Sequence, residues 1–299
     1  MFRREFWRNF DFFLFGSVLF LCVFGLIMIR STIAGNIELA NYVNRQATFL
    51  GIGMAVMLGV TVLDYHYWKS LSKLMYVFIL AFLGIILIIG TTSFGAQRWL
   101  EVGLVNIQPA ELSKIVVILV LAHYFSHNEK KPKNLRWLAT SFILVAGIIV
   151  PIFLQPNLST TILLAVIRLS MRWISGLPTK YVVIFGLGGI ALGLIAFPFL
   201  EPYQQERILT CIKPDENARH GNTYNVEQAL ITIGSGGLLG QGYNSGTQVQ
   251  LRFLKVRSTD YIFSAIAEEF GFIGTLILIA ILIFVIVRCI RAARLASDM

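Results

Sequence analysis

Cysteine and histidine are scarce in this chain, and their scarcity limits the chemistry that its side chains can perform. The 299 residues include three cysteines and four histidines. Cys22 falls in an apolar run, Cys211 in a long polar connection and Cys289 at the end of another apolar run. None of them has an obvious disulfide partner, and the histidines form no H-x-x-x-H pattern. The sequence therefore offers no metal-ligand set, and we expect no metal site built from these residues.

Charged residues are also few, and this excludes an ordinary soluble protein. They make up 14% of the chain, against 56% hydrophobic residues, and the mean hydropathy is +0.72. Soluble domains carry about 25% charged residues. The composition predicts a protein that crosses a membrane several times.

Long apolar runs supply the membrane spans. Each is long enough for a hydrocarbon core of about 30 Å, and they lie at residues 11–30, 47–63, 73–91, 109–125, 137–154, 158–175, 181–199 and 261–287. The alternation typical of barrel strands is absent from these runs, so helices that satisfy their own backbone hydrogen bonds are expected. The sequence predicts an all-α, polytopic membrane helix bundle with eight spans, forming a single domain over residues 1–299.

The distribution of basic residues predicts the orientation of the bundle. With a cytoplasmic N-terminus, the inside segments carry most of the positive charges: Arg3, Arg4, Arg8, Lys69, Lys73, Lys130, Lys131, Lys133, Arg136, Lys180, Arg288, Arg291 and Arg294. The short outside connections carry only Arg30, Arg45 and Arg98. Eight spans then place both termini in the cytoplasm and one long connection, residues 200–258, outside. A connection of that length is commonly functional.

The long connection mixes basic residues, amides and aromatic residues. Its segment 225–233 has amphipathic helical character, and a glycine-rich stretch, "GSGGLLGQG", follows at 234–242. The spacing does not fit a dinucleotide-binding fingerprint. Two interpretations stay open: backbone N–H groups that cradle a phosphate, or glycines that only shape a tight re-entrant turn, which we favour.

Carboxylates next to the apolar runs form a second polar group. Pro109 opens a helix in which Glu111 and Lys114 lie three residues apart on one face. The pair is either a structural ion pair or part of a functional cavity. Glu268 and Glu269 are consecutive in the last span and point about 100° apart, so at least one must face the bundle.

Asp260 lies at the mouth of the last span, and its position also has two interpretations. An aspartate near a helix start can cap free N–H groups. However, Ser258 or Thr259 would serve as a cap equally well. A partly desolvated carboxylate at the membrane surface can instead act as a general base on a lipid-linked substrate.

Five stretches together resemble the SEDS family (shape, elongation, division and sporulation), whose members include RodA, FtsW and SpoVE. They are "GAQRWLEVGLVNIQPAELSKI" (95–115), "LQPNLSTTILL" (154–164), "ERILT" (206–210), "ALITIGSGGLLGQGYNSGTQVQLRFL" (229–254) and "STDYIFSAIAEEFGFIG" (258–274). They span most of the chain. The "GTQVQLRFL" segment is most similar to the RodA branch, which serves elongation and cell shape.

The resemblance implies a peptidoglycan glycosyltransferase that polymerises lipid II at the outer face of the bacterial cytoplasmic membrane. The essential aspartate of the family corresponds to Asp260, which would accept the proton of the acceptor hydroxyl. The substrate-binding residues would be Arg98, Glu111, Lys114, Arg207, Gln248 and Arg252, with the arginines holding the departing diphosphate. The implied partners are lipid II and a class B penicillin-binding protein, a transpeptidase, and nucleic acid is not implied. No cofactor is firmly implied, although a divalent cation, Mg²⁺ or Mn²⁺, is compatible with the diphosphate.

The chain departs from the family pattern at several positions. The usual "PDLGT" is "PNLST", with Asn157 and Ser159, and "KVRSTD" replaces the usual residues before the aspartate. Arg168 and Arg172 stand in a span that is normally apolar, and Arg168 needs a partner at its depth. Family members usually have ten spans, so we expect the bundle to lack the last two.

Two other functions remain open from the sequence. A bundle with buried charges and an outward cavity also suits a flippase for lipid-linked precursors, although no internal repeat is visible. A catalytically inactive scaffold for the transpeptidase is the other alternative.

Overall fold

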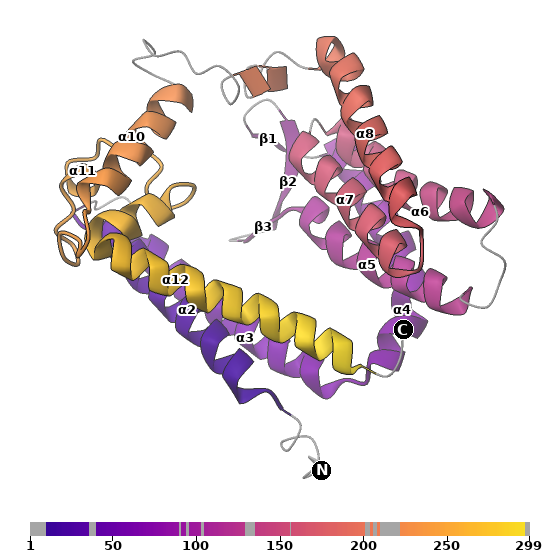
Figure 1. Ribbon diagram of the computed structural model, residues 1–299, viewed down its shortest axis with the longest axis horizontal. Helices are drawn as coiled ribbons and strands as arrows, with labels where there is room; N and C mark the ends of the chain where they lie inside the picture. Colours follow the sequence, from indigo (N-terminus) through magenta and orange to yellow (C-terminus); the bar gives the residue numbers. More distant parts are fainter. Residues whose placement is uncertain are drawn as a thin grey trace. The chain divides into compact units, whose positions relative to one another are not determined.

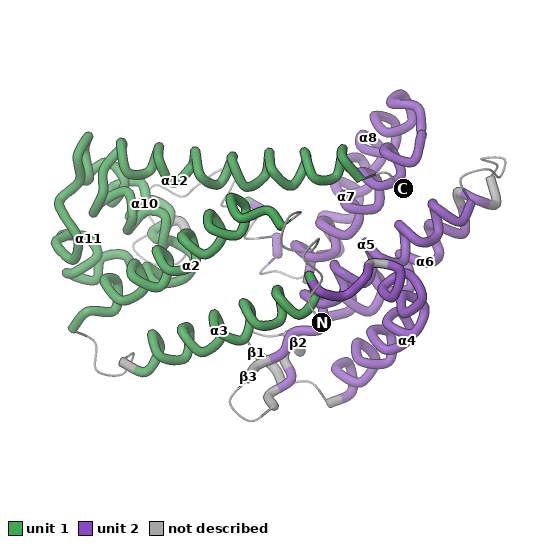
Figure 2. Tube along the Cα trace, turned by 90° about the horizontal axis from the view of Figure 1, so that it is seen from below, with its two compact units in different colours: residues 1–61, 209–298 green, residues 62–208, 299 purple. Residues whose placement is uncertain are grey.

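The computed structural model describes residues 10–35, 40–89, 91–93, 96–102, 105–128, 135–155, 157–200, 204–205, 208–209 and 222–296. The chain divides into two compact units (Figure 2). Unit 1 comprises residues 1–61 and 209–298, and unit 2 comprises residues 62–208 and 299.

Long helices account for most of the described chain (Figure 1). Within the described residues eight of them coincide with the predicted spans: α2 (Phe12–Thr32), α3 (Ala40–Val62), α4 (Tyr65–Ile89), α5 (Pro109–His127), α6 (Leu135–Leu154), α7 (Leu158–Ile174), α8 (Thr179–Ala196) and α12 (Ile262–Leu295). Six described helices are long and apolar enough to cross a membrane, whereas α6 has a shorter apolar part, Ala139–Leu154, and α7 has 17 residues. The predicted all-α, multi-pass membrane fold is confirmed.

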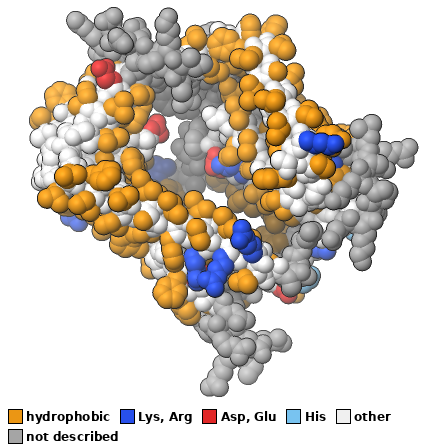
Figure 3. Space-filling model, viewed as in Figure 1, with side chains coloured by type: hydrophobic (Ala, Val, Ile, Leu, Met, Phe, Trp, Pro, Cys, Tyr) orange, Lys and Arg blue, Asp and Glu red, His pale blue; other side chains and the backbone are white. Residues whose placement is uncertain are grey.

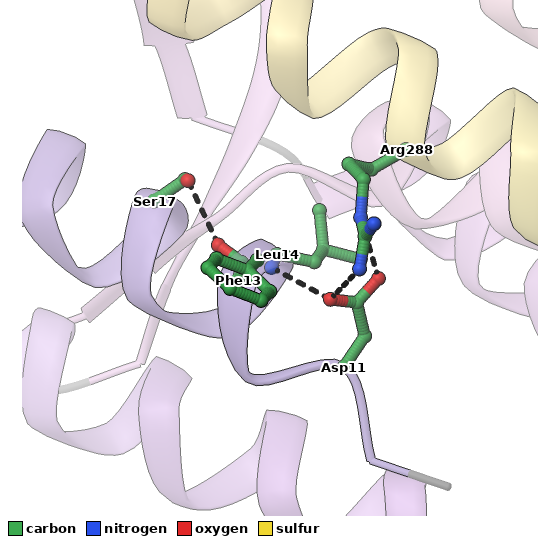
Figure 4. A network of polar contacts seen from close by, with 5 residues as sticks. All are labelled: Asp11, Phe13, Leu14, Ser17 and Arg288. Carbon is green, nitrogen blue, oxygen red and sulfur yellow. Dashed lines mark hydrogen bonds and ion pairs between the residues drawn. The ribbon is translucent and has the colours of Figure 1, made fainter.

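In unit 1, α2 and α12 pack against each other and run in opposite directions. The rings of Phe24 and Phe270 meet edge to face, with centroids 5.6 Å apart. At the far end, the guanidinium of Arg288 donates to both carboxylate oxygens of Asp11, with Nε 2.9 Å from Oδ2 (Figure 4). Asp11 also caps α2 by accepting from the N–H of Leu14 at 3.0 Å. One carboxylate therefore fixes the start of α2 to the final third of α12.

In unit 2, the core lies among α4, α5, α6 and α7. Its fully enclosed side chains include Leu83, Leu121, Ile148, Ile152 and Leu164. Helix α8 follows α7 and ends in a short 3-10 turn, Phe197–Phe199. No residue of α8 is buried in this arrangement.

The connection between α4 and α5 contains three short antiparallel strands that the sequence analysis did not predict. They are β1 (Thr91–Ser93), β2 (Ala96–Val102) and β3 (Val105–Ile107), paired in that order. Threonine, valine, tryptophan and isoleucine favour extended backbone. β1 and β3 have three residues each, below the length of about four at which periodicity identifies a strand. β2 has seven residues, and the sequence analysis missed it.

Apolar side chains cover the outward faces of the helices (Figure 3). On α12, for example, Leu276, Ile277 and Ile283 are all at least half exposed. Contiguous apolar surface of this extent is incompatible with water and typical of contact with lipid. Basic side chains gather toward the C-terminal end of α12 in the same view.

Candidate active site

Asp260 lies in unit 1, in the turn that leads into α12. Its side chain is exposed, and no described residue forms a hydrogen bond or ion pair with its carboxylate. Helix α12 begins at Ile262, and its N-cap residue is Tyr261, without a side-chain cap. The capping interpretation of Asp260 is therefore wrong. Its carboxylate is therefore unoccupied by any side chain or backbone group in the described part of the chain.

The loop that carries Asp260 is held by a second carboxylate, that of Glu268, which is completely buried. Its Oε1 accepts from the backbone N–H of Gln248 at 2.7 Å, and its Oε2 from the N–H of Val249 at 3.1 Å. The hydroxyls of Ser235 and Thr247 donate to Oε1 at 3.2 and 3.3 Å. Four donors satisfy a buried charge. The short helix α11 (Thr247–Gln250) is thereby fixed to α12.

The glycine-rich segment lies against a break in α12. Gly271 has φ +67° and ψ −168°, so it interrupts the helix. The backbone of the segment fills the break, because Gln241 and Gly242 donate to the carbonyls of Glu268 and Glu269, both at 2.9 Å, and Phe272 donates to Gly237 at 2.9 Å. The glycines shape a tight turn, as the favoured interpretation predicts. The preceding helix, α10 (Asn222–Ser235), confirms the helix predicted over 225–233.

The same loop is also attached to the C-terminal end of α2. Backbone carbonyls there accept from side chains of the loop: Tyr243 to Ile27 at 3.2 Å, Gln250 to Ser31 at 3.2 Å, Arg257 to Thr32 at 2.6 Å and Arg252 to Gly35 at 3.0 Å. Carbonyls at a helix C-terminus lack intrahelical donors and carry partial negative charge, so arginines are stabilising there.

Arg257 and Glu269 are buried residues that also bond to the C-terminal end of α2. Arg257 is 8% exposed, and burial, together with the nearby charge of Arg252, lowers its pKa. Glu269 is 1% exposed and accepts a hydrogen bond from the hydroxyl of Ser31. Both consecutive glutamates thus face the protein interior, one toward α11 and the other toward α2.

Two of the expected substrate-binding residues share the loop with Asp260. Gln248 uses its backbone N–H to bind Glu268, and its side chain is half-buried. Arg252 has φ +63°, an unusual value for a residue with a side chain. Its side chain is exposed although one nitrogen is bonded to Gly35, so part of its guanidinium remains available to a ligand.

Glu111 and Lys114 lie in unit 2, in the first turns of α5. Their predicted ion pair is formed, with Nζ 2.6 Å from Oε2. The two side chains are 56% and 27% exposed, respectively. Unit 2 therefore presents the pair at its surface and does not enclose it.

Two expected substrate-binding residues remain, Arg98 and Arg207. The backbone of Arg98 lies in β2, its side chain is outside the described residues, and Arg207 lies outside them entirely.

Asn157 keeps a structural role despite replacing an aspartate, because its side chain caps α7 by accepting from the N–H of Thr160 at 3.3 Å.

Asp260, Gln248 and Arg252 thus share the loop before α12 in unit 1, whereas Glu111 and Lys114 lie in unit 2. Sequence reasoning missed the donors that Glu268 binds and the carbonyls that Arg252 and Arg257 bind. The sequence feature that could have indicated these contacts was the pair of consecutive glutamates in an apolar helix, since buried carboxylates need hydrogen-bond donors. No group of three or more His, Cys, Asp or Glu side chains that could hold a metal occurs in the described part of the chain.

Comparison with known proteins identifies the family. The model of the FtsW/RodA/SpoVE family, described as a cell cycle protein, matches residues 12–299. The chain is 32% identical to peptidoglycan glycosyltransferase MrdB of Escherichia coli K12 over 278 residues, which cover 91% of this chain and 72% of that protein. It is also 32% identical to stage V sporulation protein E of Bacillus subtilis 168 over 295 residues, covering 94% and 78%.

Solved structures agree with this assignment. A chain from a study of how a peptidoglycan synthase complex coordinates polymerisation and crosslinking superposes with a TM-score of 0.75 at 25% identity, covering 94% of this chain and 77% of that one. The rod shape determining protein RodA of Thermus thermophilus has the same fold, with a TM-score of 0.68 at 23% identity and coverage of 98% and 78%. The chain therefore belongs to the SEDS family, that of FtsW, RodA and SpoVE.

Proposed function

We propose that this protein is a peptidoglycan glycosyltransferase that polymerises lipid II, with Asp260 as its general base. The observation that carries the proposal is the exposed carboxylate of Asp260, which has no partner among the described residues. It lies on a loop that is fixed on two sides, by Glu268 and by the end of α2. A base that is held in place but left free for its substrate fits general base catalysis. The family assignment supports the same activity.

In the proposed reaction, Asp260 accepts the proton of the acceptor sugar 4-hydroxyl. The hydroxyl oxygen attacks the anomeric carbon of the donor, and a new glycosidic bond forms. The bond between that carbon and the diphosphate breaks, releasing undecaprenyl diphosphate with inversion at the carbon. Arg252, Arg98 and Arg207 would bind the diphosphate oxygens as charge develops on them. Gln248, Glu111 and Lys114 would contact the sugars or diphosphate.

The proposal includes an orientation in the bacterial cytoplasmic membrane. Both termini face the cytoplasm, and the loop with Asp260 faces outward, where lipid II is polymerised. The Asp11–Arg288 ion pair supports termini on one side, because it joins the start of α2 to the last third of α12. A class B penicillin-binding protein is the proposed partner, and it would crosslink the glycan product.

The decisive experiment is polymerisation of lipid II by the purified protein in liposomes, with its partner transpeptidase present. Wild type should produce glycan chains, and Asp260→Asn should produce none, while both variants bind lipid II. Asp64→Asn is a matched control, because Asp64 is exposed and lies in the connection between α3 and α4; it should polymerise like wild type. Chains from Asp260→Asn would refute the assignment of the base. No chains from wild type, with folding and partner binding intact, would favour the inactive scaffold.

A further inference from the structure

Two arginines in α7 have no place in the proposed reaction. Arg168 and Arg172 are four residues apart and therefore lie on one face of the helix. Arginine within a membrane span is costly unless it is paired or reaches a polar environment. The neighbours of both side chains therefore show whether either charge is paired.

Arg172 is enclosed by aromatic side chains. It is 3% exposed, and its guanidinium carbon lies 3.0 Å from the centre of the Trp137 ring and 5.6 Å from that of Phe125. Stacking covers the face of a guanidinium but leaves the N–H groups at its edge unbound. Its Nε and Nη1 are buried without a hydrogen-bond partner among the described residues.

Arg168 lies closer to the lipid-facing surface. Its guanidinium carbon is 5.1 Å from the centre of the Phe142 ring, and Phe142 itself is 58% exposed on α6. Its Nε is also buried and without a partner in the described part of the chain. Neither arginine takes part in an ion pair with a described residue. Two neighbouring cations thus share an unmet requirement for an anion.

Other basic groups lie at the same end of unit 2. Lys69 and Lys73, at the start of α4, act electrostatically on His123 of α5, and the rings of His123 and His127 stack with centroids 6.2 Å apart. This end is on the cytoplasmic side in the proposed orientation. Basic pockets between spans on that side favour the phosphates of lipid headgroups.

We propose that Arg168 and Arg172 bind the phosphate of an anionic membrane lipid at the cytoplasmic end of α7. Phosphate oxygens accept from more than one guanidinium N–H at once, so a single phosphate can bridge both arginines. The exposed ring of Phe142 beside Arg168 places the site at the lipid boundary. The acyl chains would lie along the apolar outer face of α6. The two arginines belong to unit 2, whereas Asp260 belongs to unit 1.

The test uses the full chain in nanodiscs of phosphatidylcholine, with or without added phosphatidylglycerol. In wild type, phosphatidylglycerol should raise the melting temperature by about 2–4 °C. The variant Arg168→Leu/Arg172→Leu should lose this increase and be at least as stable as wild type in phosphatidylcholine, because it removes unpaired buried charges. The matched control, Arg291→Leu/Arg294→Leu, removes two exposed arginines from α12 and should keep the increase.

Three results would overturn the proposal. The first is a leucine variant that is less stable in phosphatidylcholine but keeps the lipid response, as expected if the arginines only stack on Trp137 and Phe142. The second is an equal increase from inorganic phosphate in phosphatidylcholine, which would indicate a soluble anion. The third is a response that becomes much larger in Glu129→Gln, which would show that this carboxylate, two residues after the end of α5 in sequence, neutralises the arginines in wild type.

A measurement on the wild type covers the case in which the leucine variant does not fold. Native mass spectrometry of protein purified from mixed lipid should show phosphatidylglycerol retained in preference to phosphatidylcholine. Arg168→Lys/Arg172→Lys keeps the charges but loses the planar fork, and should retain less of it. Equal retention of the two lipids by wild type would contradict the proposal.

Discussion

At the scale of single residues, Glu268 holds the loop that leads to Asp260. Asp260 itself has no structural partner in the described chain, whereas Glu268 accepts hydrogen bonds from the backbone N–H groups of Gln248 and Val249. The proposed base and the carboxylate that holds its loop are thus eight positions apart in sequence. Replacing that carboxylate should change the position of the base without removing it.

Glu268→Ala should impair both folding and polymerisation. It leaves the N–H groups of Gln248 and Val249 buried without an acceptor, which costs about 1–3 kcal/mol of stability. A displacement of the loop by about 1 Å should also reduce polymerisation roughly 100-fold. Both effects are measurable as the melting temperature and the rate of lipid II consumption. Glu227→Ala, at an exposed position of α10, is the control, and an equal effect there would refute a specific role for Glu268.

Lys114→Ala tests whether the Glu111–Lys114 ion pair serves activity or stability. Because the two side chains are 27% and 56% exposed, the ion pair should contribute at most about 1 kcal/mol to stability. Polymerisation should nevertheless fall strongly if the pair contacts the substrate as proposed. Lys180→Ala, which removes another exposed lysine, should affect neither quantity. A large drop in melting temperature for Lys114→Ala would show that the pair is mainly structural.

At the scale of elements, the break in α12 and the glycine-rich segment hold each other in place through backbone hydrogen bonds. Gly240 has φ +83°, and an added Cβ there would clash with the backbone carbonyl of Glu269. Gly240→Ala should therefore destabilise the loop and reduce activity, whereas Gly234→Ala should be tolerated because its Cβ would meet nothing within 4 Å. Limited proteolysis of the 234–260 region compares the two variants directly. Equal protection of both would show that the close approach does not hold the loop.

Sequence reasoning predicted elements whose signal is local. The eight apolar runs identified the eight long helices because burial in lipid demands continuous hydrophobicity. The helix at 225–233 and the turn after it were also predicted, from amphipathic periodicity and glycine content. The break at Gly271 was not predicted, because it depends on backbone donors and acceptors in the 237–242 segment, about 30 residues earlier.

In the candidate site, too, the sequence predicted the features with a local signal and missed the long-range contacts. Asp260, Gln248 and Arg252 were found by their motif, and the structure places them in one loop. The contacts of Arg257 with Thr32 and of Glu269 with Ser31 join positions more than 200 residues apart. No local pattern encodes such pairs, since each member alone is an ordinary polar residue near a helix end.

At the scale of the whole molecule, the Asp11–Arg288 pair links the two ends of the described chain (Figure 4). Hydrogen bonds from Arg288 and from the N–H of Leu14 lower the pKa of Asp11 from its usual 3.8. A lowered carboxyl pKa gives stability that is fully present above 3.8 and is lost as the pH falls through the folded-state value. The melting temperature of wild type should thus approach that of Asp11→Asn only in strongly acidic buffer. A constant difference between the two down to pH 2 would contradict this linkage.

The proposed orientation makes a prediction that the native cysteines can test. Cys211 belongs to the long connection, and Cys289 is exposed in the last third of α12, so the two should lie on opposite sides of the membrane. In spheroplasts, a membrane-impermeant maleimide should label a variant that keeps only Cys211. A variant that keeps only Cys289 should react after the membrane is permeabilised, and not before. The Asp11–Arg288 pair places the start of α2 and Arg288 at the same end of unit 1. Labelling of Cys289 from outside would therefore imply the opposite orientation of the bundle in the membrane. Asp260 would then face the cytoplasm, where it could not polymerise lipid II at the outer surface.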